Sequence, residues 1–251
     1  MNAMWSEARI KVSHRLAMHV CIDDGFLLRN RTPMVSFTFD DLPKTAVTNG
    51  ARLLEEYGAR GTFYVSGGEV GANTPDWQTG SAADVLNLYR SGHEIGCHTF
   101  SHTRACDVGM TALAAEIERN RAWFRQLDPA IAVETFAYPF GVGSFTQKYL
   151  LKEKFQTCRS IVPGLNTGFV DLQFLRATPL IDRDIYKEGI DRVFDEAKST
   201  NGWLIFYGHD VAEQPSLYGC TPDLLTHALQ AATRRKIPVL TMAEALRCAR
   251  T

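Results

Sequence analysis

The chain alternates short apolar runs with longer segments in which apolar residues recur at helical spacing. Runs rich in β-branched and aromatic residues predict strands at 34–39, 62–65, 93–97, 135–138, 176–181, 203–207 and 237–240. The helical spacing predicts helices at 45–57, 81–90, 111–127, 147–154, 184–198 and 224–235. Strand and helix therefore follow one another over most of the chain.

This alternation predicts an α/β fold. The strands are apolar along their whole length, which is typical of a parallel sheet covered by helices. Seven or eight strand–helix units predict a single-domain (β/α)7–8 barrel with mostly parallel strands, and a doubly wound open sheet is the alternative. No linker or internal repeat divides the chain. We expect residues 1–33 to form an N-terminal extension packed on the barrel, and residues 34–251 to form the functional domain.

Composition and charge exclude several classes of protein. The 251 residues are 45% hydrophobic and 22% charged, with a formal net charge of −1, so a nucleic acid is not expected as a partner. No apolar run reaches the roughly 18 residues of a membrane span, and the N-terminus lacks the pattern of a secretory signal. The six cysteines are scattered, without a C-x-x-C pair, which predicts reduced thiols. These features predict a soluble, cytoplasmic protein.

Acids and histidines follow the predicted strands. Asp40 and Asp41 come directly after the strand 34–39, His98 after 93–97, residues 138–141 after 135–138, and His209 after 203–207. In a parallel sheet the carboxyl ends of the strands meet at one edge, where binding and catalytic residues gather. The sequence therefore predicts one polar site built from four separate segments.

Three residues in these segments are suited to holding a metal ion. Side chains alternate along a strand, so Asp40 and Asp41 must point in different directions. His98 and His102 are four residues apart, a spacing that would bring both imidazoles to one side of a helical turn. Asp41, His98 and His102 together suit Zn²⁺ or another divalent ion, and also the facial triad of non-haem iron oxygenases. Those oxygenases are antiparallel β-barrels, which the strand–helix alternation disfavours.

Four motifs resemble those of the polysaccharide deacetylases, carbohydrate esterase family 4. They are T-F-D-D at 38–41, H-T-F-S-H at 98–102, F-A-Y-P-F-G at 136–141 and F-Y-G-H-D at 206–210. They occur in the order of the family and, with their surroundings, cover residues 35–245. The resemblance implies a distorted (β/α) barrel and a metal-dependent amide hydrolase that removes an N-acetyl group from an amino sugar.

The resemblance also implies a role for each motif residue. Asp40 would be the general base, His209 the general acid, and the backbone N–H of Phe140 would stabilise the oxyanion. The metal would be held by Asp41, His98 and His102, most simply as Zn²⁺, with Co²⁺, Mn²⁺, Ni²⁺ or Fe²⁺ as alternatives.

Two departures from the family pattern need compensation. Ala137 stands where the family commonly has the arginine that orients the catalytic base, and we expect Arg176 to supply this charge. The aspartate that tunes the acid histidine has no clear match, and Asp182 and Asp184 are the candidates. These gaps leave open a catalytically inactive, glycan-binding relative.

Aromatic residues are the candidates for contact with a sugar. Tyr138, Tyr207, Trp77 and Tyr218 could stack on sugar rings, although each could equally fill core or loop space. The region 203–222 resembles a subgroup that includes deacetylases associated with bacterial surface-polysaccharide genes. We expect an N-acetylated amino sugar in a saccharide or glycoconjugate precursor as substrate. A small cyclic or formyl amide is the alternative.

Overall fold

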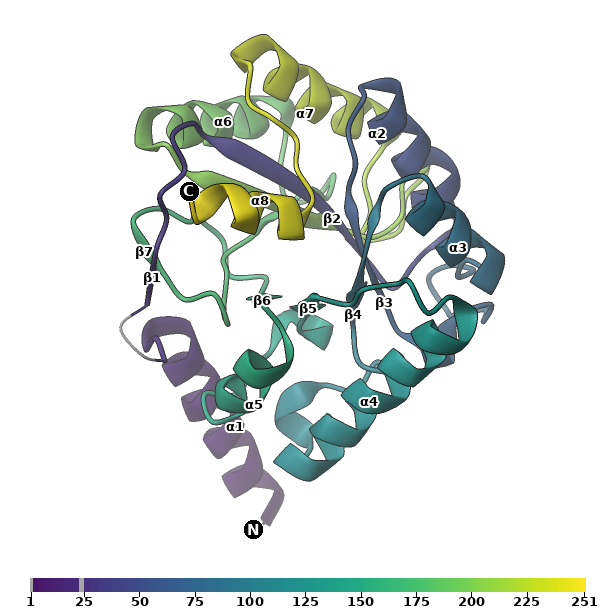
Figure 1. The fold of residues 1–251 in the computed structure, drawn as a ribbon, viewed down its shortest axis with the longest axis vertical. Helices are drawn as coiled ribbons and strands as arrows, with labels where there is room; N and C mark the ends of the chain where they lie inside the picture. Colours follow the sequence, from purple (N-terminus) through teal and green to yellow (C-terminus); the bar gives the residue numbers. More distant parts are fainter. Residues whose placement is uncertain (1, 23–24) are drawn as a thin grey trace.

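A parallel sheet forms the centre of the molecule (Figure 1). The computed structural model of the protein describes residues 2–22 and 25–251. Seven strands pair in the order β6-β5-β4-β3-β2-β9-β8, and each neighbouring pair is parallel. Their bounds are β2 Met34–Asp40, β3 Thr62–Val65, β4 Glu94–Cys97, β5 Thr135–Ala137, β6 Thr157–Arg159, β8 Thr178–Pro179 and β9 Trp203–Gly208. The predicted α/β fold with parallel strands is confirmed.

Helices connect the strands and cover the outside of the sheet (Figure 1). Helices α6 and α7 pack on each other, and α5 lies beside the N-terminal helix α1. The bounds are α1 Asn2–His19, α2 Arg52–Glu56, α3 Ala82–Arg90, α4 Met110–Leu127, α5 Gln147–Lys154, α6 Lys187–Thr200, α7 Pro222–Arg235 and α8 Met242–Ala249. A π-helical turn, Ala46–Ala51, precedes α2. No helix among the described residues is both long and apolar enough to cross a membrane.

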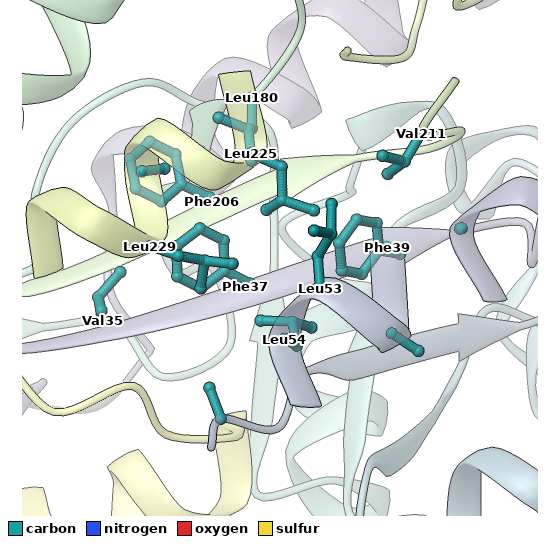
Figure 2. Packing of buried hydrophobic residues seen from close by; sticks show 14 of the residues in the cluster. Val35, Phe37, Phe39, Leu53, Leu54, Leu180, Phe206, Val211, Leu225 and Leu229 are labelled. Carbon is teal, nitrogen blue, oxygen red and sulfur yellow. The ribbon is translucent and has the colours of Figure 1, made fainter. Parts of the chain in front are cut away.

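The two faces of the sheet bury different side chains. On β2, Val35, Phe37 and Phe39 point outward into a cluster with Leu225 and Leu229 of α7 (Figure 2). Burying a side chain of this size stabilises the fold by about 1.5–3 kcal/mol. Because side chains alternate along a strand, the even-numbered residues of β2, which end with Asp40, face the other side. The acid at the end of β2 is therefore directed to the inner face of the sheet.

The inner face is concave because the sheet is curled. Strands β2 and β6 are separated by three others, which would place them about 19 Å apart in a flat sheet. Nevertheless, Arg159 at the end of β6 forms an ion pair with Asp40 at the end of β2. Only a sheet curled toward a barrel brings these two ends together, and the predicted distorted (β/α) barrel is confirmed.

Helix α8 fills the barrel at the amino ends of the strands. Met242 and Leu246 belong to the buried cluster that contains Trp203 and Tyr64 on the inner face. The first amides of the helix are bound to the sheet: Met242 N–H donates to Thr62 Oγ1 over 3.0 Å, and the next amide donates to the Glu94 carboxylate over 2.9 Å. The opposite end, where Asp40 lies, is left for the site.

Two predicted strands are shorter or absent. The segment 176–181 pairs as a strand only at Thr178–Pro179, because Arg176 N–H bonds to Asn166 Oδ1 instead. Residues 237–240 form a single bridge between Val239 and Val35 and then enter α8. Pro238 has no N–H to continue a ladder of hydrogen bonds. The end helices α1 and α8 and the strand β6 were not predicted.

The N-terminal segment packs on the rest of the molecule. Lys148 of α5 is buried and donates to the carbonyls of Ala17 and Val20 over 2.9 and 2.7 Å. The short strand β1, Phe26–Leu27, pairs with β7, Phe169–Val170. The domain boundary expected at residue 33 stays a prediction. The cysteines are all free thiols, as their spacing predicted.

Candidate functional site

A cavity of about 510 Å³ lies at the carboxyl ends of the strands. Its wall includes residues from each of the four segments that the sequence predicted: Asp40, Asp41, His98, His102, Phe140 and His209. The predicted convergence of acids and histidines at this edge is therefore present in the fold.

Asp41, His98 and His102 lie close enough together to hold a metal ion. One ligand atom from each lies within 4.8 Å of the others. Asp41 Oδ1 is 3.4 Å from His98 Nε2 and 3.2 Å from His102 Nε2. The expected helical turn is wrong, because Thr99 and His102 have φ angles of 61° and 49°, in the left-handed region. The chain bends sharply after β4, and this bend brings the second imidazole back to the first.

The protonation of these groups fits a divalent cation. His98 Nδ1 donates to the Ala137 carbonyl over 2.8 Å, so Nε2 presents its lone pair to Asp41. Burial lowers the pKa of His98 to about 3 and therefore keeps the imidazole neutral, which is the ligand form. Burial raises the pKa of Asp41 to about 7, and its buried Oδ1 has no hydrogen-bond partner among the residues that the structure describes. A cation would satisfy this oxygen.

Asp40 is buried beside the triad and is paired with Arg159. Burial alone would raise the pKa of Asp40, but the Arg159 guanidinium at hydrogen-bond distance reverses this effect and holds the pKa below its usual value. Asp40 is therefore a carboxylate at neutral pH. Because Arg159 contacts Oδ1, the other oxygen, Oδ2, is left for the cavity.

The predicted role of Arg176 is wrong. Its Nη1 donates to the Pro163 carbonyl over 3.0 Å, and no contact joins it to Asp40 in the described structure. The partner of Asp40 is Arg159, which the sequence analysis did not single out. The alternation of strands and helices requires a strand after the helix 147–154, and an arginine at its end could have been found by that rule.

His209 lies near the second carboxylate oxygen of Asp41, whereas His98 and His102 lie near the first. Its Nε2 is 3.8 Å from Asp41 Oδ2, and its Nδ1 is 3.2 Å from the Tyr218 carbonyl. The rings of Trp77 and Tyr218 pack against the imidazole with centroid distances of 5.3 and 5.7 Å. The imidazole is thus held by one carbonyl and two aromatic rings.

The aspartates predicted to tune His209 do not contact it in the described structure. Asp182 accepts a hydrogen bond over 3.0 Å from the N–H of Thr221, which is the N-cap residue of α7. Asp184 lines the cavity, but its ion-pair partner is Arg183, at 3.3 Å. The Tyr218 carbonyl, rather than an aspartate, lies at Nδ1 of His209.

A tight turn brings the backbone of Phe140 to the cavity. Phe140 has a φ of 59°, and its ring, 59% exposed, lies 4.6 Å from the ring of His102. Gly141 follows with a φ of 68°, and a Cβ at this position would lie 2.1 Å from Ile161. The turn therefore requires glycine after Phe140.

Three of the four aromatic candidates line the cavity, namely Trp77, Tyr207 and Tyr218. Tyr138 does not. Its ring is fully buried in the core, and its hydroxyl donates to the Gln173 carbonyl over 2.9 Å. The predicted contact of Tyr138 with a sugar is therefore wrong. It follows β5, but its side chain points away from the site.

Solved structures of a deacetylase and of an esterase share this fold. A chitin deacetylase from the fungal pathogen Colletotrichum lindemuthianum superposes with a TM-score of 0.63 at 17% identity, covering 87% of this chain and 90% of that one. A family 4 acetyl xylan esterase from Clostridium thermocellum, solved with a cobalt ion, gives a TM-score of 0.59 at 22% identity, covering 85% and 90%. At these identities the likeness establishes the fold.

Comparison of sequences identifies the family. A chitin deacetylase of Arthroderma benhamiae is 33% identical over 86 residues, which are 34% of this chain and 22% of that enzyme. The match thus spans about a fifth of the curated relative. The family model described as Polysaccharide deacetylase matches residues 28–155, half of the chain, including the T-F-D-D and H-T-F-S-H motifs. The chain therefore belongs to the polysaccharide deacetylase family.

Proposed function

We propose that the protein is a metal-dependent hydrolase that removes the N-acetyl group from an amino sugar. The observation that carries this proposal is the cluster of Asp41, His98 and His102 between the buried Asp40 and His209. When bound by the triad, a divalent ion, most simply Zn²⁺, supplies Lewis acidity to the amide carbonyl and to the attacking water. Family membership supports the hydrolase class and a carbohydrate substrate.

Asp40 and His209 move the protons in this proposal. Asp40 Oδ2 takes a proton from the attacking water, since Oδ1 is bound to Arg159. His209 Nε2 faces the cavity and donates a proton to the departing amine, which is a poor leaving group unless it is protonated. The backbone N–H of Phe140 stabilises the negative charge that develops on the carbonyl oxygen.

The sugar would lie among the aromatic rings on the His209 side of the cavity. Trp77 and Tyr218 meet edge to face with their centroids 6.3 Å apart, and Tyr207 also lines the wall. Flat apolar rings beside carboxylates are suited to the faces and hydroxyls of a pyranose. The proposed substrate is an N-acetylated amino sugar in a precursor of a saccharide or glycoconjugate, and the cytoplasmic location stays a prediction from the sequence.

The test is acetate release by metal-loaded protein. Chelated protein is reloaded separately with Zn²⁺, Co²⁺, Mn²⁺, Ni²⁺ or Fe²⁺ and assayed with N-acetylated mono-, di- and oligosaccharides, and with formyl amides for formate. We expect acetate from a saccharide, lost on chelation and in Asp40→Asn. If every saccharide is bound equally well by Asp40→Asn and by the unaltered protein, and no acetate appears, the protein is a glycan-binding relative.

A further inference from the structure

Helix α1 lies against the loop 142–146, which directly follows the turn that contains Phe140. Ser13 Oγ of this helix lies 2.9 Å from Ser144 Oγ and accepts a hydrogen bond from the Phe145 N–H over 3.2 Å. Because Ser13 Oγ accepts the amide hydrogen, its own hydrogen is free to be donated to Ser144. One hydroxyl of α1 therefore binds two consecutive residues of the loop.

The next residue of α1 binds the same loop. His14 Nδ1 lies 3.3 Å from the Gly143 carbonyl, which can only accept, so this nitrogen carries the hydrogen and donates it. Burial lowers the pKa of His14 and keeps its imidazole neutral at pH 7. The imidazole meets the Phe174 ring edge to face with the centroids 5.8 Å apart, and a Cβ on Gly143 would lie 2.6 Å from that ring. His14 and Phe174 together hold the loop at Gly143.

Lys148 of α5 binds the C-terminal end of α1, beside which α5 lies (Figure 1). Its side chain is fully buried, and Nζ donates to the carbonyls of Ala17 and Val20 and forms an ion pair with Asp171. The last carbonyls of a helix have no partner within the helix, and a cation near them is favourable. A buried ammonium without such acceptors would be costly. The attachment of α1 is therefore part of the interior of the protein.

The turn at Phe140 depends on the chain around it. Phe140 has a φ of 59°, a conformation that is costly for a residue with a side chain and persists where the surrounding structure imposes it. Within the turn, the Gly141 N–H donates to the Tyr138 carbonyl over 2.8 Å, and the Val142 N–H donates to the Pro139 carbonyl over 3.5 Å, which is long for a hydrogen bond. The contacts with α1 fix the direction in which the chain leaves this turn.

We propose that Ser13 and His14 are positioning residues for the backbone N–H of Phe140, and that α1 is therefore part of the functional site. By holding residues 143–145, they determine where the preceding turn places this N–H in the cavity. Helix α1 lies outside residues 28–155, which the family model matches, so family membership does not imply this role. The inference rests on the proposed function for its kinetic consequences, whereas opening of the loop can be measured without any reaction.

The kinetic test compares Ser13→Ala, His14→Phe and the double variant with Val12→Ala, a matched control that changes an exposed neighbour on the same helix. Phenylalanine at position 14 keeps a ring against Phe174 but removes the donor to the loop. The oxyanion forms only during the reaction, so a displaced N–H lowers kcat and leaves KM unchanged.

Removing an oxyanion donor costs about 100- to 1,000-fold in kcat, and displacing it should cost less. We expect the double variant to lose about tenfold in kcat, with KM and Zn²⁺ affinity changed less than about threefold. Ser13→Thr, which keeps a hydroxyl, should retain most of kcat, and Val12→Ala all of it. Unchanged kcat in the double variant, an equal loss in Val12→Ala, or a loss that appears in KM or in Zn²⁺ affinity overturns the proposal.

Amide hydrogen exchange of residues 140–146 tests the same contacts without a reaction, because exchange reports local opening of the chain. We expect these amides to exchange at least about tenfold faster in the double variant than in the unaltered protein, with β2 and β9 unchanged. Exchange that is unchanged in the loop, or faster throughout the molecule, overturns the proposal. This result holds even if the unaltered protein releases no acetate, an outcome that would refute the proposed function alone.

Discussion

Asp40 and Asp41 are neighbours at the end of one strand, yet the protein shifts the pKa values of their carboxyl groups in opposite directions. Burial acts on both. It raises the pKa of Asp41 to about 7, whereas the Arg159 cation outweighs burial at Asp40 and keeps that pKa low. Asp40 is the last residue of β2 and faces the cation, whereas Asp41 has a φ of 63°, and this left-handed turn brings its carboxylate to two neutral imidazoles. Asp40 is therefore suited to act as a base, and Asp41 is suited to bind a metal ion.

The low pKa of His98 predicts a loss of stability in acid. The metal-free folded state keeps this imidazole neutral down to about pH 3, while the unfolded chain takes up a proton near pH 6.5. Stability is therefore fully present above pH 6.5 and falls as the pH drops toward 3, by about 2–3 kcal/mol at pH 4.5. Urea unfolding of metal-free protein at pH 7 and 4.5 should show this loss, and His98→Gln should reduce it.

The unaltered protein and the His98→Gln variant share all their other titrating groups. Asp41 has a raised pKa and acts in the opposite direction, but it is present in both and cancels. An acid-induced loss of equal size in His98→Gln would show that another group is responsible.

The residues of the site could be predicted from sequence to different extents. The triad and Asp40 were found because each follows a recognisable apolar strand. The contact between Asp40 and Arg159 joins residues 119 positions apart, and it depends on how far the sheet curls, which periodicity does not encode. The environment of His209 was missed for a similar reason, since a backbone carbonyl leaves no signature in the sequence.

At the level of secondary structure, strands and helices with a strong apolar pattern could be predicted, and some short elements could not. The long strands β2 and β9 and most helices were predicted within a few residues, because their apolar patterns are strong. The short strand β6 and the helix α8 were missed. β6 consists of Thr157, Cys158 and Arg159 and has no large apolar residue, whereas β5, which is equally short, contains Phe136. Helix α8 begins with a capping box, in which Thr241 and Glu244 bond each other's amides. That box is visible in the sequence as T-M-A-E.

Glu94 joins four elements and predicts a stability effect away from the site. Its carboxylate accepts hydrogen bonds from Thr62 of β3, Thr135 of β5 and the Ala243 amide of α8. Replacing it with alanine leaves these donors without their partner, so Glu94→Ala should lower the free energy of unfolding by about 2–3 kcal/mol. Denaturant titration measures the change, and Zn²⁺ affinity should stay the same. A loss of Zn²⁺ binding would contradict the view that Glu94, at the amino ends of the strands, stabilises the fold without affecting the metal site at the carboxyl ends.

For the whole molecule, the triad connects segments from distant parts of the chain, so a bound ion should stabilise the entire fold. At Zn²⁺ concentrations about 100 times the Kd, binding adds about 2.7 kcal/mol, which raises Tm by roughly 5–10 °C. Thermal melts with and without Zn²⁺ measure this shift. Asp41→Asn should abolish it and Asp40→Asn should preserve it. Equal shifts in both variants would place the ion elsewhere.

The position of α8 has a consequence for turnover. In the described structure, Met242 and Leu246 are packed into the amino end of the barrel, opposite the site. In the proposed reaction, the substrate would therefore enter the cavity, and the amine and acetate would leave it, at the carboxyl ends of the strands. Acetate bound near the triad would block binding of the next acetamido group, so we expect the products to inhibit the reaction as they accumulate.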